Sequence, residues 1–93
     1  MILPGAMYSL EYTTTVIDKD IPRLSADVKS RIKNTIEKKL RVDPLTFGKP
    51  LRYSLRGLRS LRVGDYRVIY SLDFEKNCVL IVKIGYRKEV YEN

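Results

Sequence analysis

The second half of the chain constrains the fold most strongly, because short apolar-rich segments alternate there with turn residues. Segments rich in aliphatic, aromatic and β-branched residues are typical of β-strands. Glycine stands first in the two-residue connection Gly64-Asp65, which is the pattern of a tight hairpin turn. The predicted strands are residues 51–55, 58–63, 66–72 and 78–84. They predict a sheet that contains at least one antiparallel hairpin.

A helical pattern dominates the first half of the chain. Apolar residues recur at every fourth position over residues 24–40, as expected for the buried side of an amphipathic helix. Ser25 stands where an N-cap would stand, and Asp43-Pro44 should end the helix. We therefore predict a helix over residues 26–41. The apolar positions are Leu24, Val28, Ile32, Ile36 and Leu40, and the outward-facing basic residues are Lys29, Lys33 and Lys38.

The segment before this helix predicts a further strand and a shorter helix. Apolar and polar residues alternate over residues 8–12, which is the period of a half-buried strand. Residues 16–21 favour a short helix that Pro22 should end or kink. We expect residues 1–6 to form a disordered leader and residues 7–93 to form a single domain with one core.

The period of two along the predicted strands assigns each side chain to a face of the sheet. The apolar sets expected to face the helices are Cys78, Leu80, Val82 and Ile84; Tyr66, Val68, Tyr70 and Leu72; and Leu61 and Val63. The basic residues left on the helix-free face are Arg62, Arg67, Lys83 and Arg87. They predict a phosphate-binding surface, and a ladder of long side chains that covers exposed sheet is the alternative.

Basic residues are concentrated in two segments of a chain whose net charge is +7. Residues 27–41 hold six basic against two acidic side chains, and residues 49–67 hold six against one. Five of the six in the second segment are arginine, whose planar guanidinium suits phosphate recognition. This surplus is typical of proteins that bind polyanions, although a merely solvated basic face remains open for both segments.

Missing residue types exclude several kinds of chemistry. With no histidine and only Cys78, the chain cannot assemble a Cys/His zinc site or a Ser-His-Asp triad. Its five glycines match no nucleotide-binding loop. The longest apolar run, residues 79–82, is too short to span a membrane, and the first ten residues do not look like a signal peptide. We expect a cytoplasmic protein without a membrane anchor or cofactor, with Cys78 packed in the core.

Four stretches of the sequence resemble the RelE branch of the RelE/ParE toxin superfamily, and the resemblance covers roughly residues 7–93. They are DIPRL at 20–24, FGKPL at 47–51, LRSLRVGDYRVIY at 58–70 and GYRKEVY at 85–91. Proteins of this family are small toxins of bacterial and archaeal toxin-antitoxin pairs. The resemblance implies an α+β fold with two N-terminal helices on one face of a small antiparallel sheet of about four strands. It also implies an endoribonuclease that cuts messenger RNA in the ribosomal A site.

The resemblance further implies roles for individual residues. It assigns the transition-state arginine to Arg67, a second phosphate-binding arginine to Arg87 and a catalytic tyrosine to Tyr91. The sequence departs from the family at Ser60 and Tyr86, where many members carry a basic residue or histidine, and this leaves the general base open. Further phosphate or RNA contacts are expected from Arg59, Arg62, Lys83, Lys29, Lys33 and Lys38.

The chemistry implied is attack of an RNA 2′-hydroxyl on the adjacent phosphate, a step that needs no metal. Arginine cannot serve as the base because its pKa lies above about 12, so its expected role is to stabilise the charged phosphorane. The expected partners are the ribosome, messenger RNA and a cognate antitoxin with an acidic or amphipathic bound segment. Two alternatives remain: a ParE-like inhibitor of DNA gyrase, and an RNA-binding module without turnover.

Overall fold

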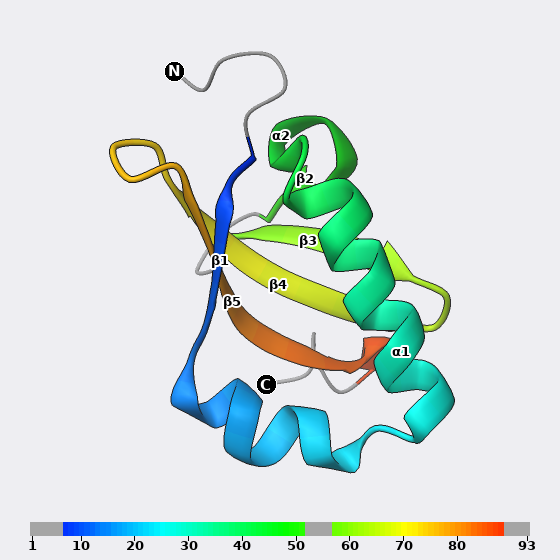
Figure 1. The fold of residues 1–93 in the computed structure, drawn as a ribbon. Coiled ribbons are helices and arrows are strands. Elements are labelled where there is room, and N and C mark those ends of the chain that lie inside the picture. Colours follow the sequence, from blue (N-terminus) through cyan, green and yellow to red (C-terminus); the bar gives the residue numbers. More distant parts are fainter. Residues whose placement is uncertain (1–6, 52–56, 89–93) are drawn as a thin grey trace.

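The computed structural model describes residues 7–51 and 57–88, in which helices pack against one face of a five-stranded sheet (Figure 1). The strands are β1 (Ser9–Tyr12), β2 (Lys49–Pro50), β3 (Arg59–Val63), β4 (Tyr66–Asp73) and β5 (Cys78–Tyr86), in the order β1-β5-β4-β3-β2. The predicted α+β class is confirmed. The prediction of a small antiparallel sheet is corrected to a mixed sheet, because β1 lies parallel to β5. Parallel neighbours need a long connection, and the helices within residues 16–47 lie between these two strands in the sequence.

The first half of the described chain forms two helical segments over one face of the sheet. The shorter segment comprises η1 (Val16–Asp20) and η2 (Ile21–Arg23), and the longer one comprises α1 (Ala26–Thr35) and η3 (Ile36–Leu40). Both predicted helices are confirmed: the Val28 amide donates to Ser25 Oγ at 3.3 Å, and Pro22 lies in the last turn of the shorter segment. The buried core contains Tyr8, Val16, Ile32, Ile36, Leu40, Leu61, Val63, Val68, Tyr70, Val79, Ile81 and Ile84.

A widened last turn keeps the apolar stripe of the long helix over the sheet. Apolar residues four apart drift by about 40° per step around a regular α-helix, because each residue advances by about 100°. In η3 the Arg41 amide donates to the Ile36 carbonyl at 3.1 Å, which is the i→i+5 bond of a π-helical turn. Each residue of such a turn advances less, so the drift is reduced. Ile36 and Leu40 are accordingly both fully buried.

A β-bulge changes the predicted faces of β5. The pairing with β4 runs from Ile69↔Lys83 to Tyr70↔Ile81, so Val82 has no partner on β4 and the alternation shifts there. The helix-facing residues are therefore Val79, Ile81 and Ile84, and the prediction of Cys78, Leu80 and Val82 for this face is wrong. Cys78 is nonetheless buried. The predicted faces of β3 and β4 are confirmed.

Turn and cap residues complete the frame. Gly64 has φ +60°, as the predicted turn between β3 and β4 requires. Asp43 caps α2 (Pro44–Phe47), since its Oδ1 accepts from the Thr46 amide at 3.2 Å. Helix α2 and strand β2 thus lie between the predicted helix 26–41 and the predicted strand 51–55, where no element was predicted. The predicted leader, residues 1–6, and residues 52–55 of the predicted strand 51–55 lie outside the described residues.

Candidate functional site

Two arginines oppose each other at the turn end of the β3–β4 hairpin. Arg62 and Arg67 are partners in the antiparallel register, and Arg67 is also the partner of Gly85 on β5. Their sequence neighbours Leu61, Val63 and Val68 belong to the core under the helices. Because side chains alternate along a strand, Arg62 and Arg67 lie on the face that the helices leave uncovered.

Arg87 comes to the same end of the sheet. Its amide donates to the Asp65 carbonyl at 2.8 Å, which fastens the residue after β5 to the hairpin turn. The Arg87 side chain is exposed. The structure therefore brings Arg87 to the same end of the β3–β4–β5 sheet as Arg62 and Arg67, although it follows Arg67 by 20 residues in the sequence.

Electrostatics make this end of the sheet suitable for an anion. Arg62 Nε donates to the Gly64 carbonyl at 3.2 Å, and Arg67 Nη1 donates to the Tyr66 carbonyl at 3.1 Å. These bonds orient the guanidinium groups without neutralising their charge. Like charges directly opposite each other on paired strands destabilise a sheet. A phosphate bound at this end of the sheet could accept several charge-assisted hydrogen bonds.

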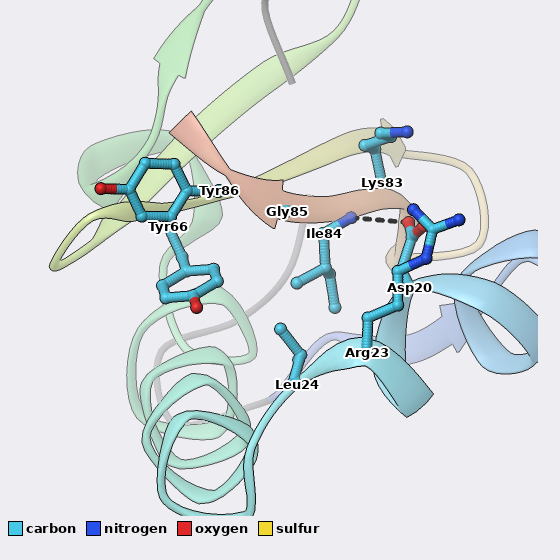
Figure 2. Close-up of a pocket in the computed structure, with 8 residues that line it drawn as sticks. All are labelled: Asp20, Arg23, Leu24, Tyr66, Lys83, Ile84, Gly85 and Tyr86. Carbon is cyan, nitrogen blue, oxygen red and sulfur yellow. Dashed lines mark hydrogen bonds between the residues drawn. The ribbon is translucent and has the colours of Figure 1, made fainter. Parts of the chain in front are cut away.

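Lys83 extends the basic area toward the open edge of β5. It is half-buried and pairs in register with Ile69. It also lines a cavity of about 210 Å³ together with Asp20, Arg23, Leu24, Tyr66, Ile84, Gly85 and Tyr86, which Figure 2 shows. Residues from the shorter helical segment, β4 and β5 therefore meet beside the arginines.

Asp20 is a residue of this cavity that the sequence analysis did not select. Only 4% of it is exposed, and its Oδ2 accepts from the Ile84 amide at 2.9 Å (Figure 2). Strand β1 pairs with β5 only as far as Ile81. The Ile84 amide lies beyond this pairing, and the Asp20 carboxylate accepts its hydrogen bond instead. A signal existed in the sequence, because Asp20 continues the four-residue spacing from Val16 to Leu24.

Two tyrosines form one wall of the cavity. Tyr66 and Tyr86 are register partners on β4 and β5, and their ring centroids lie 5.6 Å apart at an interplanar angle of 81°. Tyr66 also packs against the core, as the sequence predicted. Tyr86 is 38% exposed, which leaves its ring accessible beside Gly85 and Arg87.

Four other predicted site residues lie elsewhere. Arg59 shares the parity of Leu61, and its Nη2 donates at 2.8 Å to the carbonyls of both Leu45 and Gly48. Its guanidinium therefore stabilises the α2 region and does not lie beside Arg62 and Arg67. Lys29, Lys33 and Lys38 are exposed on the long helix, as is Lys39. Tyr91 lies outside the described residues, and Ser60 is half-buried on β3.

The described ranges contain no group of three or more His, Cys, Asp or Glu side chains placed to hold a metal ion. Among the same residues, no helix has the length and apolar character needed to cross a membrane.

Comparisons with known proteins agree on one family. Residues 12–91 match the model of the ParE toxin of the type II toxin-antitoxin system parDE. The chain is 33% identical over 84 residues to toxin RelG of Mycobacterium tuberculosis, covering 90% of this chain and 95% of that protein. It is 36% identical over 84 residues to toxin RelE of the same organism, covering 90% and 86% of the two chains.

A solved structure supports the same conclusion. The fold superposes with a TM-score of 0.83 on a chain of the toxin-antitoxin complex RelBE2 from M. tuberculosis, at 32% identity and with 89% of this chain and 94% of that chain covered. The family match spans most of the sequence. The protein therefore belongs to the RelE/ParE superfamily of toxins from type II toxin-antitoxin systems.

Proposed function

We propose that this toxin is a ribosome-dependent endoribonuclease that cuts messenger RNA in the A site and thereby inhibits translation in the cytoplasm. The observation that carries the proposal is the convergence of Arg62, Arg67 and Arg87 at one end of the helix-free face. Three guanidinium groups around one end of a sheet fit a phosphodiester better than they fit an uncharged ligand.

In the proposed reaction the 2′-hydroxyl oxygen forms a bond to the adjacent phosphorus and the bond from phosphorus to the 5′ oxygen breaks. The 2′-hydroxyl proton passes to a base, and the leaving 5′ oxygen takes up a proton, giving a 2′,3′-cyclic phosphate and a 5′-hydroxyl. Arg67 and Arg87 stabilise the additional negative charge on the phosphorane. The ribosome contributes by holding the messenger so that the attacking and leaving oxygens are in line.

A tyrosine is the proposed proton-transfer group, since the chain has no histidine. The family resemblance assigns this role to Tyr91. Tyr86 is the nearest described candidate, because it is exposed and follows Gly85 at the same end of β5. A tyrosine needs cationic neighbours to lower its pKa from about 10 before it acts as a base, and Arg87 is adjacent in sequence.

We also propose that a cognate antitoxin neutralises the toxin. The structural relative from M. tuberculosis is a toxin-antitoxin complex, and a chain of net charge +7 favours an acidic partner. Growth should be rescued by co-expression of the antitoxin encoded beside the toxin gene. The proposal of an antitoxin fails if no protein encoded beside the toxin binds it or restores growth.

The deciding experiment is induction of the toxin in cells followed by mapping of messenger 5′ ends. We expect cuts at fixed codon positions within translated reading frames. The matched family model describes a ParE toxin, so gyrase inhibition is the second candidate. Supercoiling defects with intact messages would replace the nuclease by the gyrase inhibitor, and neither effect would indicate an RNA-binding module without turnover.

A further inference from the structure

The last residues of β5 lose a neighbouring strand before the chain reaches Arg87. On the outer edge, β1 pairs with β5 only as far as Ile81. On the inner edge, Val82 is bulged out of the pairing with β4, and a bulge bends a strand and disrupts its ladder locally. In the described part of the chain, the outer edge of residues 82–86 therefore depends on contacts from outside the sheet.

Asp20 supplies such a contact. Its Oδ2 accepts a hydrogen bond from the Ile84 amide at 2.9 Å, as Figure 2 shows. Asp20 is the last residue of η1, so this bond ties the shorter helical segment to the end of β5. A hydrogen bond to an ionised carboxylate is roughly twice as strong as one between neutral groups.

Packing alone does not explain a carboxylate at this position. Asp20 stands midway between Val16 and Leu24 in a four-residue spacing, and both of these apolar residues contribute to the core. An apolar side chain would suit the same place, because a buried carboxylate costs free energy unless its interactions compensate. Within the described residues no ion pair joins Asp20 to Arg23 or Lys83, although all three line one cavity. A residue that breaks a local pattern in this way is expected where function requires it.

The amide that Asp20 binds lies next to the part of β5 that positions the arginines. Gly85 pairs in register with Arg67. Two residues later, the Arg87 amide donates to the Asp65 carbonyl at 2.8 Å. The backbone that leads to Arg87 is thus fastened on both sides, to the hairpin turn through Arg87 itself and to the shorter helical segment through Ile84.

We infer that Asp20 is a positioning residue, which fixes the end of β5 so that Arg87 and Arg67 contact the same phosphate. The inference rests on the proposed function, because the reaction concerned is cleavage of messenger RNA. Asp20 acts through the backbone and touches neither the RNA nor the reacting atoms. Catalysis is sensitive to such placement, since a displacement of about 1 Å at the reacting groups can lower the rate by about 10²-fold.

The first experiment measures single-turnover cleavage of ribosome-bound messenger. Asp20→Ala removes the acceptor and should lower the rate constant by about 10²-fold. Asp20→Asn retains a side-chain oxygen that accepts from the Ile84 amide, so its rate constant should stay within about tenfold of the wild type. Equal losses in these two variants would overturn the inference, because the negative charge and not the acceptor would then matter.

Asp18→Ala is the matched control. It removes an exposed carboxylate from the same helical segment, two residues before Asp20, and so changes the net charge by the same amount. It should cleave at the wild-type rate. A loss as large as that of Asp20→Ala would attribute the effect to the charge of the segment and overturn the inference.

A double-mutant cycle tests whether Asp20 acts through Arg87. Combining Asp20→Ala with Arg87→Ala should lower the rate constant no further than Arg87→Ala alone, since a side chain that is already absent cannot be misplaced. A general contribution of Asp20 to the fold would instead multiply the two losses. Multiplied losses would therefore overturn the inference.

Amide hydrogen exchange measures the positioning without cleavage. In Asp20→Ala the amides of Ile84 and Arg87 should exchange at least about tenfold faster than in the wild type, because their segment opens locally. The amides of Val68 and Tyr70, which are fully buried on β4, should keep their rates. Unchanged exchange at Arg87 would overturn the inference, and so would equal acceleration at all four amides.

The two proposals fail separately. If the wild-type toxin leaves messengers intact, the nuclease proposal is wrong, and hydrogen exchange still decides whether Asp20 fixes the backbone that leads to Arg87. If the wild type cuts messengers but Asp20→Ala cuts them equally fast, the nuclease remains and the role of Asp20 is refuted.

Discussion

The two ends of the β3–β4 hairpin use arginine for different purposes. At the end away from the turn, Arg59 donates to the Leu45 and Gly48 carbonyls beneath α2. At the turn end, Arg62 and Arg67 oppose each other on the uncovered face. Whether a basic residue in a strand supports the fold or can bind a ligand therefore depends on the face it occupies and on the carbonyl groups that the fold brings near it.

The end around Arg59 is a closely packed set of polar contacts. Tyr70 is fully buried, and its hydroxyl donates to the Pro44 carbonyl at 2.6 Å. Burial raises the pKa of this hydroxyl, and the hydrogen bond and charge of Arg59 act in the opposite direction. At the turn end, by contrast, Arg62 and Arg87 are exposed. Substitutions should therefore affect stability at one end and activity at the other.

The largest expected effect is at the turn end. Arg67→Ala or Arg87→Ala should lower single-turnover messenger cleavage by about 10² to 10³-fold, the scale for losing one electrostatic stabiliser of a transition state. Ribosome binding should fall much less, because Lys29, Lys33 and Lys38 remain. Arg67→Lys should also be damaging, since an ammonium cannot make a two-pronged phosphate contact.

Lys76→Ala is the matched control for these variants, because it removes an exposed charge from the β4–β5 turn. The Lys76→Ala variant should cleave messenger RNA at the wild-type rate. Near wild-type cleavage by the Arg67 and Arg87 variants would show that the assigned site is wrong. Parallel loss of cleavage and ribosome binding in a folded variant would make these arginines docking groups.

At the other end, Arg59→Met should lower the free energy of unfolding by about 2–3 kcal/mol, because charged hydrogen bonds to two carbonyls are lost. Thermal unfolding should show a decrease of roughly 8–20 °C for a domain of this size. If Arg59→Met instead unfolds like the wild type but fails to cleave messenger, Arg59 belongs with the RNA-binding residues and the contrast between the two ends disappears.

Gly48 tests how tightly the Arg59 end is packed. A Cβ at this position would overlap the Tyr70 hydroxyl oxygen, so Gly48→Ala should cost about 1–3 kcal/mol. Removing that oxygen should relieve the closest part of the overlap, although the ring carbons Cζ and Cε1 would still lie 2.6 and 2.9 Å from the added Cβ. In a double-mutant cycle measured by denaturant unfolding, Tyr70→Phe should therefore cost less in the Gly48→Ala background than alone, and strict additivity would contradict the packing explanation.

The smallest effect is expected from Tyr70→Phe alone. It should lower the free energy of unfolding by about 1–2 kcal/mol, because the Pro44 carbonyl loses its hydrogen-bond donor.

The raised pKa of Tyr70 also implies that stability depends on pH. Below pH 10 the hydroxyl is protonated in both folded and unfolded chains; above it the unfolded chain ionises first, so stability declines as pH rises toward the folded pKa. The denaturant concentration at the unfolding midpoint, measured between pH 8 and 11, should fall less steeply with pH for Tyr70→Phe than for the wild type. Identical slopes would rule out this role of Tyr70.

Local patterns in the sequence predicted much of the arrangement of helices and strands. The four-residue apolar spacing and Ser25 defined the long helix, and the alternation of residues in β3 and β4 put Arg62 and Arg67 on one face. The same alternation already groups Arg59 with Leu61 and Val63. These features are predictable because helix capping and strand alternation depend on residues that are close in sequence.

Residue patterns were thus enough to predict the two longer helical segments, the β3–β4 hairpin and the family resemblance. The parallel pairing of β1, the short helix α2, the bulge at Val82 and the polar contacts depend on the tertiary structure. The carbonyls that engage Arg59 lie 14 and 11 residues away, and the amide that Asp20 accepts lies 64 residues away. No local period encodes such partners. They exist because folding brings separate elements together, and buried polar groups must then find hydrogen-bond partners where the fold provides them.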